Sequence, residues 1–203
     1  IEDADFEIRD TIGWLYGSGF PKSHNLKGKY EGWGSALKPA WEPIIMARKP
    51  FKGTVANNVL TYGTGAINID DCRVGDEIIS THNAPKGTFA GGEENRGSDI
   101  SSYKEHIGRW PANIIHDGSE EVLDIFPNKS SRFFYCAKTS KKDRNEGCEE
   151  LEEKQYSFDG RKVENETAYQ RNKSVSSNNH PTIKPTELMR YLCRLITPKE
   201  GIV

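Results

Sequence analysis

The sequence has no long apolar run, no closely spaced cysteine pair and almost no net charge, and each absence excludes a class of protein. A membrane-spanning helix needs roughly 20 consecutive apolar residues, and no stretch approaches that length. The acidic start Ile-Glu-Asp-Ala-Asp-Phe-Glu lacks the basic and apolar regions of a secretory signal. We therefore expect a cytoplasmic protein with no membrane partner.

The cysteines and the charge balance exclude further classes of protein. The cysteines are widely spaced and form no Cys-x-x-Cys pair, which argues against a disulfide framework and a zinc ribbon: Cys72, Cys136, Cys148 and Cys193. No compact ligand spacing suggests any other metal site. The formal net charge of −2 gives no overall attraction to nucleic acid, so contacts with phosphates would need local basic patches.

Hydrophobic patterns predict three strands and one helix. Apolar and polar residues alternate over 6–16, as in a strand with one interior face. The apolar run 43–47 predicts a well-buried second strand, and the aromatic run 132–137 predicts a third. Pro185 can begin a helix that ends before Pro198 and presents one apolar face, made of Leu188, Met189, Leu192, Leu195 and Ile196.

The remaining segments carry weaker signals. Residues 54–79 combine glycines with short β-prone pieces, and the glycine-rich stretch 83–106 predicts a loop. Charged residues far outnumber apolar ones over 141–180, which predicts an excursion from the core or a disordered stretch. Residues 201–203 have the composition of a strand that is just beginning.

One motif carries a family resemblance. The segment His180-Pro181-Thr182-Ile183-Lys184-Pro185, followed by Thr186-Glu187-Leu188-Met189, resembles the HPTxKPxxLM element of amino-group DNA methyltransferases. Other segments match in the expected order, namely FEIRDTIGWLYGSGFPKS, KPAWEPIIMARKPF, YGTGAINIDDCRVG, RWPANIIHDG and RFFYCAKTSKKDR. Together they cover most of the chain and are most similar to the phage and bacterial branch of the family.

The resemblance implies an α/β fold, a partial Rossmann-like methyltransferase sheet with an irregular target-recognition insertion. It divides the chain into core strands at 1–53, a recognition insert at 54–108, a core strand region at 109–140, a polar excursion at 141–179, and a donor-pocket helix with the next strand at 180–203. A sheet that lacks strands has exposed edges, so pairing with a second copy as a homodimer is compatible with this architecture.

The resemblance also implies a reaction and a set of site residues. Transfer of a methyl group from S-adenosylmethionine to adenine N6 is favoured over transfer to cytosine N4, with double-stranded DNA as substrate. Thr182, Lys184 and Pro185 would line the donor pocket, with Lys184 near the donor carboxylate or a neighbouring acid. Contacts with the target base or with DNA phosphates would come from Trp41, Glu42, Arg48, Lys49, Lys138, Lys141, Lys142 and Arg144.

The family's catalytic [DNS]PP[YFW] tetrapeptide does not occur in the sequence. We expect it upstream of Ile1, and the glycine-rich donor loop after Val203, so the chain contains no catalytic residue and alone would be inactive. An amino group attacks the sulfonium methyl directly, so orientation of a flipped base matters more than a nucleophile. The alternatives are a DNA-binding module without methyl transfer, or the same fold acting on RNA or protein.

Overall fold

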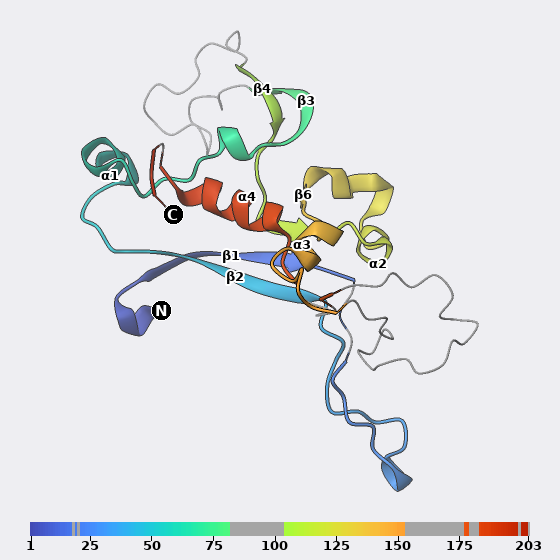
Figure 1. Ribbon diagram of the computed structural model, residues 1–203. Coiled ribbons are helices and arrows are strands. Elements are labelled where there is room, and N and C mark those ends of the chain that lie inside the picture. Colours follow the sequence, from blue (N-terminus) through green and yellow to red (C-terminus); the bar gives the residue numbers. More distant parts are fainter. Residues whose placement is uncertain are drawn as a thin grey trace.

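The computed structural model describes residues 1–17, 19, 21–81, 104–152, 177–178, 183–198 and 200–202. Its centre is a mixed sheet of four strands in the order β2-β1-β5-β6. Strand β1 (Glu7–Leu15) pairs antiparallel with β2 (Trp41–Arg48) and parallel with β5 (Ile114–His116), which pairs parallel with β6 (Tyr135–Cys136). The mixed α/β class expected from the sequence is therefore present (Figure 1).

Strand β1 forms where the alternation predicts it. Its interior face is buried at Ile12 and Trp14, and Tyr16 follows in the same phase just after the strand, whereas Ile8 remains 45% exposed. Strand β2 alternates between exposed and half-buried positions, so the prediction of a well-buried strand was wrong. The reason is its position: β2 lies at the edge of the four-stranded sheet and is covered on one face only.

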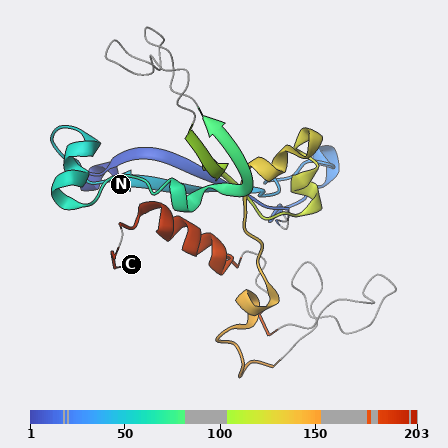
Figure 2. The same ribbon diagram turned by 90° about the horizontal axis from the view of Figure 1, so that it is seen from above.

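Helix α4 (Thr186–Ile196) follows Pro185 as predicted and lies along one face of the sheet (Figures 1 and 2). Its buried stripe is Leu188, Tyr191 and Leu195. Met189 and Ile196, assigned to this face from the sequence, are 50% and 62% exposed. They stand about 100° around the helix from Leu188 and Leu195, and so flank the buried stripe rather than belong to it.

The core is formed between this helix and the sheet. Leu188, Tyr191 and Leu195 cluster with side chains of β1, β5 and the end of β6. The ring of Tyr191 stacks on Tyr135 with centroids 3.9 Å apart and planes 10° apart. Burial raises the pKa of Tyr191 to about 12. Helix α4 is thereby fixed over the strands whose carboxyl ends form the edge described below.

The β-prone pieces predicted for 54–79 are confirmed only at the end of that range, where strand β3 begins at Val74. Val55–Tyr62 form helix α1, in which the Thr54 side chain accepts a hydrogen bond from the Asn57 N–H and Gly63 closes the C-terminus in the left-handed conformation. Val74–Thr81 (β3) and Lys104–Arg109 (β4) then form a separate antiparallel ribbon. Its base is irregular and contains Gly108 at φ 81°. The loop predicted at 83–106 falls mainly outside the described residues.

The third predicted strand is much shorter than 132–137. Only Tyr135 and Cys136 pair as β6, because residues Pro127–Phe133 form 3₁₀ turns. Within those turns Asn128 and Lys129 have φ values of 52° and 58°, which cannot continue into a strand. Short helices α2 (Glu120–Leu123) and α3 (Lys141–Asn145) flank this region, so the polar excursion begins with an ordered helix.

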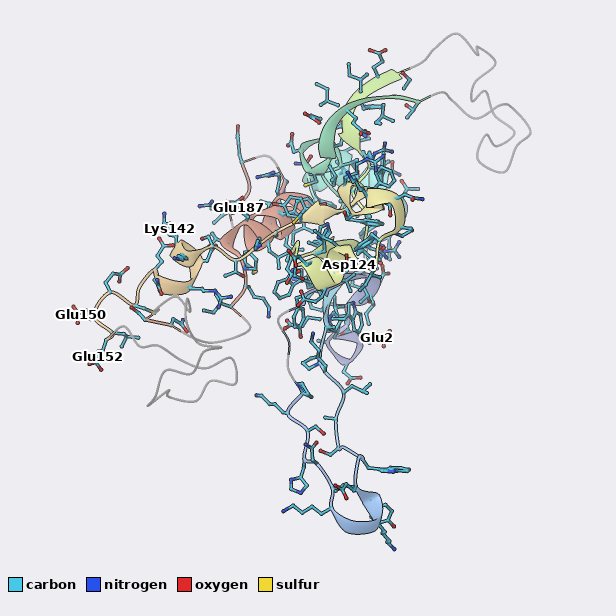
Figure 3. The ribbon with its side chains drawn as sticks, turned by 90° about the vertical axis from the view of Figure 1, so that its right-hand side faces the viewer. Glu2, Asp124, Lys142, Glu150, Glu152 and Glu187 are labelled. Carbon is cyan, nitrogen blue, oxygen red and sulfur yellow. The ribbon has the colours of Figure 1, made fainter. Side chains whose placement is uncertain are left out.

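Two further segments complete the described chain. Residues 21–40 form an arm that leaves the body after β1 and returns to start β2 (Figures 1 and 3). Gly201 and Ile202 are not in a strand, so that prediction was wrong for the two residues described there. Within the described ranges, no helix is both long and apolar enough to cross a membrane.

Candidate functional site

The carboxyl ends of the parallel strands β1, β5 and β6 meet at one edge of the sheet, where the antiparallel β2 begins. Tyr16, Asp117 and Ala137 follow these strands, and Glu42 is the second residue of β2. Open α/β sheets bind ligands in the crevice outside the carboxyl ends of their strands. This edge is therefore the first place to examine for chemistry.

An ion pair joins two of the residues singled out from the sequence. The Lys184 Nζ atom lies 2.6 Å from the Glu42 Oε2 atom, and the two side chains are 35% and 33% exposed. The same Nζ atom lies 4.8 Å from the centre of the Trp14 ring. A cation over an indole face is attracted by the ring quadrupole, so Lys184 is held by a carboxylate and an aromatic ring at once.

Tyr16 completes the surroundings of Glu42. Its side chain is 3% exposed and its ring centre lies 5.1 Å from that of Trp14. Burial raises the pKa of the Tyr16 hydroxyl, and the negative charge of Glu42 and a hydrogen bond to that carboxylate raise it further. Glu42 thus lies next to a neutral phenol as well as to the ammonium group of Lys184.

The backbone around Lys184 is anchored to the segment that follows β6. The Thr139 hydroxyl donates a 2.9 Å hydrogen bond to the Ile183 carbonyl, and the Thr186 N–H donates one of 3.0 Å to the Asp143 carboxylate. Pro185, between these contacts, is fully buried. These three interactions position the start of α4 and, with it, the lysine side chain.

Asp143 serves two helices. In α3 it forms a reciprocal capping box with Ser140, and it also accepts the hydrogen bond from the first residue of α4. Hydrogen bonds from Ser140 and Thr186 hold the pKa of the Asp143 carboxyl well below its usual range. The charged carboxylate therefore joins α3 to α4 next to the candidate site.

Asp117 and His116 shape the adjoining loops. Asp117 accepts hydrogen bonds from the Gly17 N–H (3.1 Å) and from Ser119, which fixes the turn after β1. His116 is 3% exposed; its Nδ1 accepts from the Gly118 N–H, so its Nε2 is the donor to the Ser131 carbonyl. Both residues have structural partners, and the described part of the chain contains no cluster of potential metal ligands.

The other sequence-nominated residues are spread over two places. Arg48 and Lys49 lie at the opposite end of β2 from Glu42, where Arg48 forms a 2.6 Å ion pair with Glu7. The second basic group follows β6 and so lies on the site's side of the sheet: Lys138, Lys141, Lys142 and Arg144. Figure 3 shows Lys142 on α3 at the outside of the molecule.

Trp41 stands next to Glu42 and is 53% exposed. Its indole covers Gly13 so closely that an added Cβ on that glycine would overlap the ring nitrogen. Thr182 lies outside the described residues. The structure therefore joins Glu42, Lys184 and Pro185 at one edge and places Arg48 and Lys49 elsewhere. Trp41 lies at the same edge, but its ring is on the opposite face of the sheet, over Gly13.

A cavity of about 740 Å³ lies at the far end of the sheet. Arg48, Phe51 and Trp110 contribute to its wall, and neither Glu42 nor Lys184 does. We place the candidate site at the carboxyl edge because charged and aromatic groups converge there at the ends of parallel strands. The cavity wall also contains charged and aromatic side chains, but it lies away from the carboxyl ends of the parallel strands.

A comparison with models of protein families identifies the family of the chain. A family model described as DNA methylase matches residues 1–203. The chain belongs to the DNA methylase family. Its general activity is therefore DNA methylation, and the expected amino-group DNA methyltransferase family is supported. No curated protein and no solved structure matched the chain.

Sequence reasoning missed three residues that support the site of this DNA methylase. The alternation over 6–16 places Tyr16 on the interior face but does not indicate its contact with Glu42, because that contact links different strands. Asp143 was assigned no role, although Ser140-x-x-Asp143 has the spacing of a capping box and could have indicated a helix start. Thr139 left no signal, since its partner is a backbone carbonyl 44 residues away.

Proposed function

We propose that these 203 residues form the target-recognition region and one wall of the S-adenosylmethionine pocket of an amino-group DNA methyltransferase, acting on adenine N6 in preference to cytosine N4. The observation that carries the proposal is the convergence of Glu42, Lys184, Trp14 and Tyr16 at the carboxyl edge of the sheet. The recognition region is 54–108, which includes helix α1 and most of the β3–β4 ribbon.

The side chains at this edge fit the chemistry of the methyl donor. S-adenosylmethionine carries a carboxylate, which a cation can bind, and an ammonium group and ribose hydroxyls, which can donate to an acceptor. A pocket that binds it therefore needs a cation and an acceptor close together. Lys184 and Glu42 offer this pair. The indole N–H of Trp14 is buried and has no hydrogen-bond partner among the described residues, so it is an additional donor for an oxygen atom. Pro185 and Thr182 complete the proposed donor-binding set.

The roles of the chain's own residues are binding and orientation. The bound donor supplies an electrophilic methyl group, which an exocyclic amino group can attack without help from a cysteine. Lys184 and Glu42 fix the direction of the donor, and the buried rings of Trp14 and Tyr16 exclude water from one side. Trp41 precedes Glu42 at the same end of β2, and its exposed indole, on the opposite sheet face over Gly13, is the proposed contact with the flipped target base.

Two basic groups make the proposed contacts with DNA phosphates. Lys138, Lys141, Lys142 and Arg144 follow β6 on the side of the donor edge, and Arg48 with Lys49 lies at the other end of β2. Phosphate contacts set position and orientation on the duplex, and they supply most of the salt-dependent affinity. No catalytic tetrapeptide occurs in the sequence, so we assign no catalytic residue to these 203 positions.

A methyl-transfer assay tests the proposal. Labelled S-adenosylmethionine and a mixed-sequence duplex are incubated with the chain and with a version extended at both ends. The expected result is transfer to adenine N6 by the extended version only. If both versions are inactive yet bind DNA with an affinity that ignores the donor, the chain is instead a DNA-binding module. Transfer to RNA or protein in preference to DNA would also contradict the proposal.

A further inference from the structure

The arm formed by residues 21–40 contains the longest run of exposed residues in the part of the chain that the structure describes. All of its residues except Ser23 are exposed, and it projects away from the sheet and from α4 (Figures 1 and 3). A surface segment of this length that packs against nothing gains no stability from a core.

The arm nevertheless has a defined conformation. Its two halves are joined by a bridge between Asn25 and Gly34 and by a 2.9 Å hydrogen bond from the Leu26 N–H to the Trp33 carbonyl. Near its base, the Ser23 hydroxyl accepts a hydrogen bond from the Ser35 N–H. A 3₁₀ turn, Gly28–Tyr30, forms the tip. The arm therefore presents its side chains in a fixed arrangement.

The charge of the arm differs from that of the chain as a whole. It contains a single carboxylate, Glu31, and four lysines, whereas the whole chain has a net charge of −2: Lys22, Lys27, Lys29 and Lys38. A local excess of lysines on a projecting segment is the electrostatic pattern of phosphate binding. It also opposes pairing with a second copy, because two such arms would repel each other.

Aromatic side chains are interleaved with these lysines. Trp33 is 66% exposed and Tyr30 is 47% exposed, and their ring centres lie 6.3 Å apart in an edge-to-face arrangement. The Lys29 Nζ atom lies 4.9 Å from the Tyr30 ring centre. Exposed aromatic rings next to cations suit the stacked bases and the phosphates of nucleic acid.

The arm is rooted at the candidate site. The Tyr16 N–H donates a 3.0 Å hydrogen bond to the Ala40 carbonyl, which closes the base of the arm. Here Gly19 approaches Pro39 so closely that an added Cβ would overlap the proline carbonyl oxygen. The returning half leads directly into Trp41 and Glu42. The base of the arm is therefore adjacent to the proposed target-base position, and its tip, with Tyr30 and Trp33, lies further out.

We propose that the 21–40 arm is a DNA clamp, in which its lysines contact the phosphates of a duplex that extends from the donor edge, and Trp33, near the tip, stacks against a base step further along that duplex. This inference rests on the proposed function. It adds a DNA-contacting surface that lies outside both the 54–108 recognition region and the two basic groups. The arm and the donor edge would then both contact the same DNA duplex.

Two substitutions in the 203-residue chain separate the two kinds of contact. Lys27→Ala combined with Lys38→Ala removes two charges without touching the Lys29–Tyr30 pair, and Trp33→Ala removes the exposed ring. Matched controls are Arg9→Ala combined with Arg190→Ala, which removes two exposed cations elsewhere, and Trp110→Ala, since Trp110 is 65% exposed. Circular dichroism confirms that each variant is folded.

Affinity for a fluorescent mixed-sequence duplex is measured by anisotropy at several salt concentrations between about 50 and 200 mM. Over about this range, binding that depends on phosphate contacts weakens strongly as salt is added. The double lysine variant should lower the slope of log affinity against log salt by about two. Trp33→Ala should weaken binding by about 5- to 150-fold, more on a duplex with one mismatched pair, where a base is already unstacked. Both controls should bind like the unsubstituted chain.

Each of the other possible results would overturn the clamp. If the unsubstituted chain binds DNA and the arm variants bind equally well, the clamp is wrong while the proposed function stands. If the unsubstituted chain does not bind DNA, the DNA-binding part of the proposed function fails and the clamp fails with it. If Trp33→Ala instead converts a dimer into a monomer by sedimentation, with DNA affinity unchanged, the arm binds a second copy and the inference is overturned.

Discussion

The ion pair between Glu42 and Lys184 can be tested by its effect on folding, independently of any ligand. We consider a double-mutant cycle made of Glu42→Gln, Lys184→Met and the two together. Methionine keeps most of the apolar stem of the lysine and removes only its charge. The cycle isolates the energy with which the two side chains interact, because effects of each substitution on the rest of the molecule cancel.

The expected size follows from the geometry. The two charged groups are 2.6 Å apart, but each side chain is about one-third exposed, so solvent screens much of the attraction. Exposed pairs of this kind contribute about 0.2 to 1 kcal/mol, and we expect a coupling energy near ~0.5 kcal/mol. Lys184→Met should cost about 1 to 2 kcal/mol in total, because it also removes the contact with the Trp14 ring.

Urea unfolding of the unsubstituted chain, the two single variants and the double variant measures these free energies. The midpoints and slopes are compared at low salt and in about 1 M NaCl, where the electrostatic screening length falls to roughly 3 Å. The coupling should fall clearly at high salt, while the loss of the Trp14 contact should persist in Lys184→Met. A coupling energy indistinguishable from zero at low salt would refute the pairing of Glu42 with Lys184. A coupling that does not respond to salt would show that its origin is not electrostatic.

Three further predictions follow from other parts of the fold. Because the pKa of Asp143 is depressed, its carboxylate stabilises the fold above its unfolded pKa of about 4, and this stabilisation is lost as the pH falls. The free energy of unfolding lost in Asp143→Ala should therefore be smaller at acid pH than at neutral pH, as measured by urea titration. Gly108→Ala should destabilise the β3–β4 ribbon by roughly 1 to 3 kcal/mol, since φ is 81° and the added Cβ would lie 2.6 Å from the Gly75 carbonyl oxygen; faster amide exchange confined to the ribbon would report it, and unchanged exchange would contradict it. Lys129→Gly should raise stability by about 0.5 to 1 kcal/mol, because it relieves a left-handed residue at φ 58°; a lower thermal midpoint would count against this.

Local patterns identified the elements whose cause is local. Strand β1 follows from the alternation that ends at Tyr16, and α4 follows from Pro185 and the apolar stripe that includes Leu188 and Leu195. Helix α1 was missed because its residues, such as Asn57 and Asn58, are weak helix formers and none of them is buried. Its caps are the clearest local features that favour the helix.

The failures at β2 and β6 have non-local causes. Apolar composition suggested a buried β2, but burial depends on whether a neighbouring strand covers it, and β2 is at the edge. The aromatic run before β6 was read as strand, whereas two left-handed residues, Asn128 and Lys129, divert the chain first. Neither the edge position nor these backbone angles has a reliable signature in the sequence.

The candidate site could be anticipated only in part. Glu42 and Lys184 were each nominated through the family resemblance, but for different roles, one at the target base and the other at the donor. Their direct contact joins positions far apart in the sequence, and it depends on how α4 is anchored by Thr139 and Asp143. Such a contact is a property of the packed fold and cannot be read from local spacing.

The most direct test of the account is donor affinity at the carboxyl edge of the sheet. Equilibrium dialysis with labelled S-adenosylmethionine would compare the version extended at both ends with its Lys184→Ala and Arg190→Ala variants. Arg190 is the matched control, a cation on the same helix that also pairs with a carboxylate. We predict a loss of about 10- to 100-fold for Lys184→Ala and none for Arg190→Ala. Unchanged donor affinity in Lys184→Ala would contradict the assignment of this edge as the donor site.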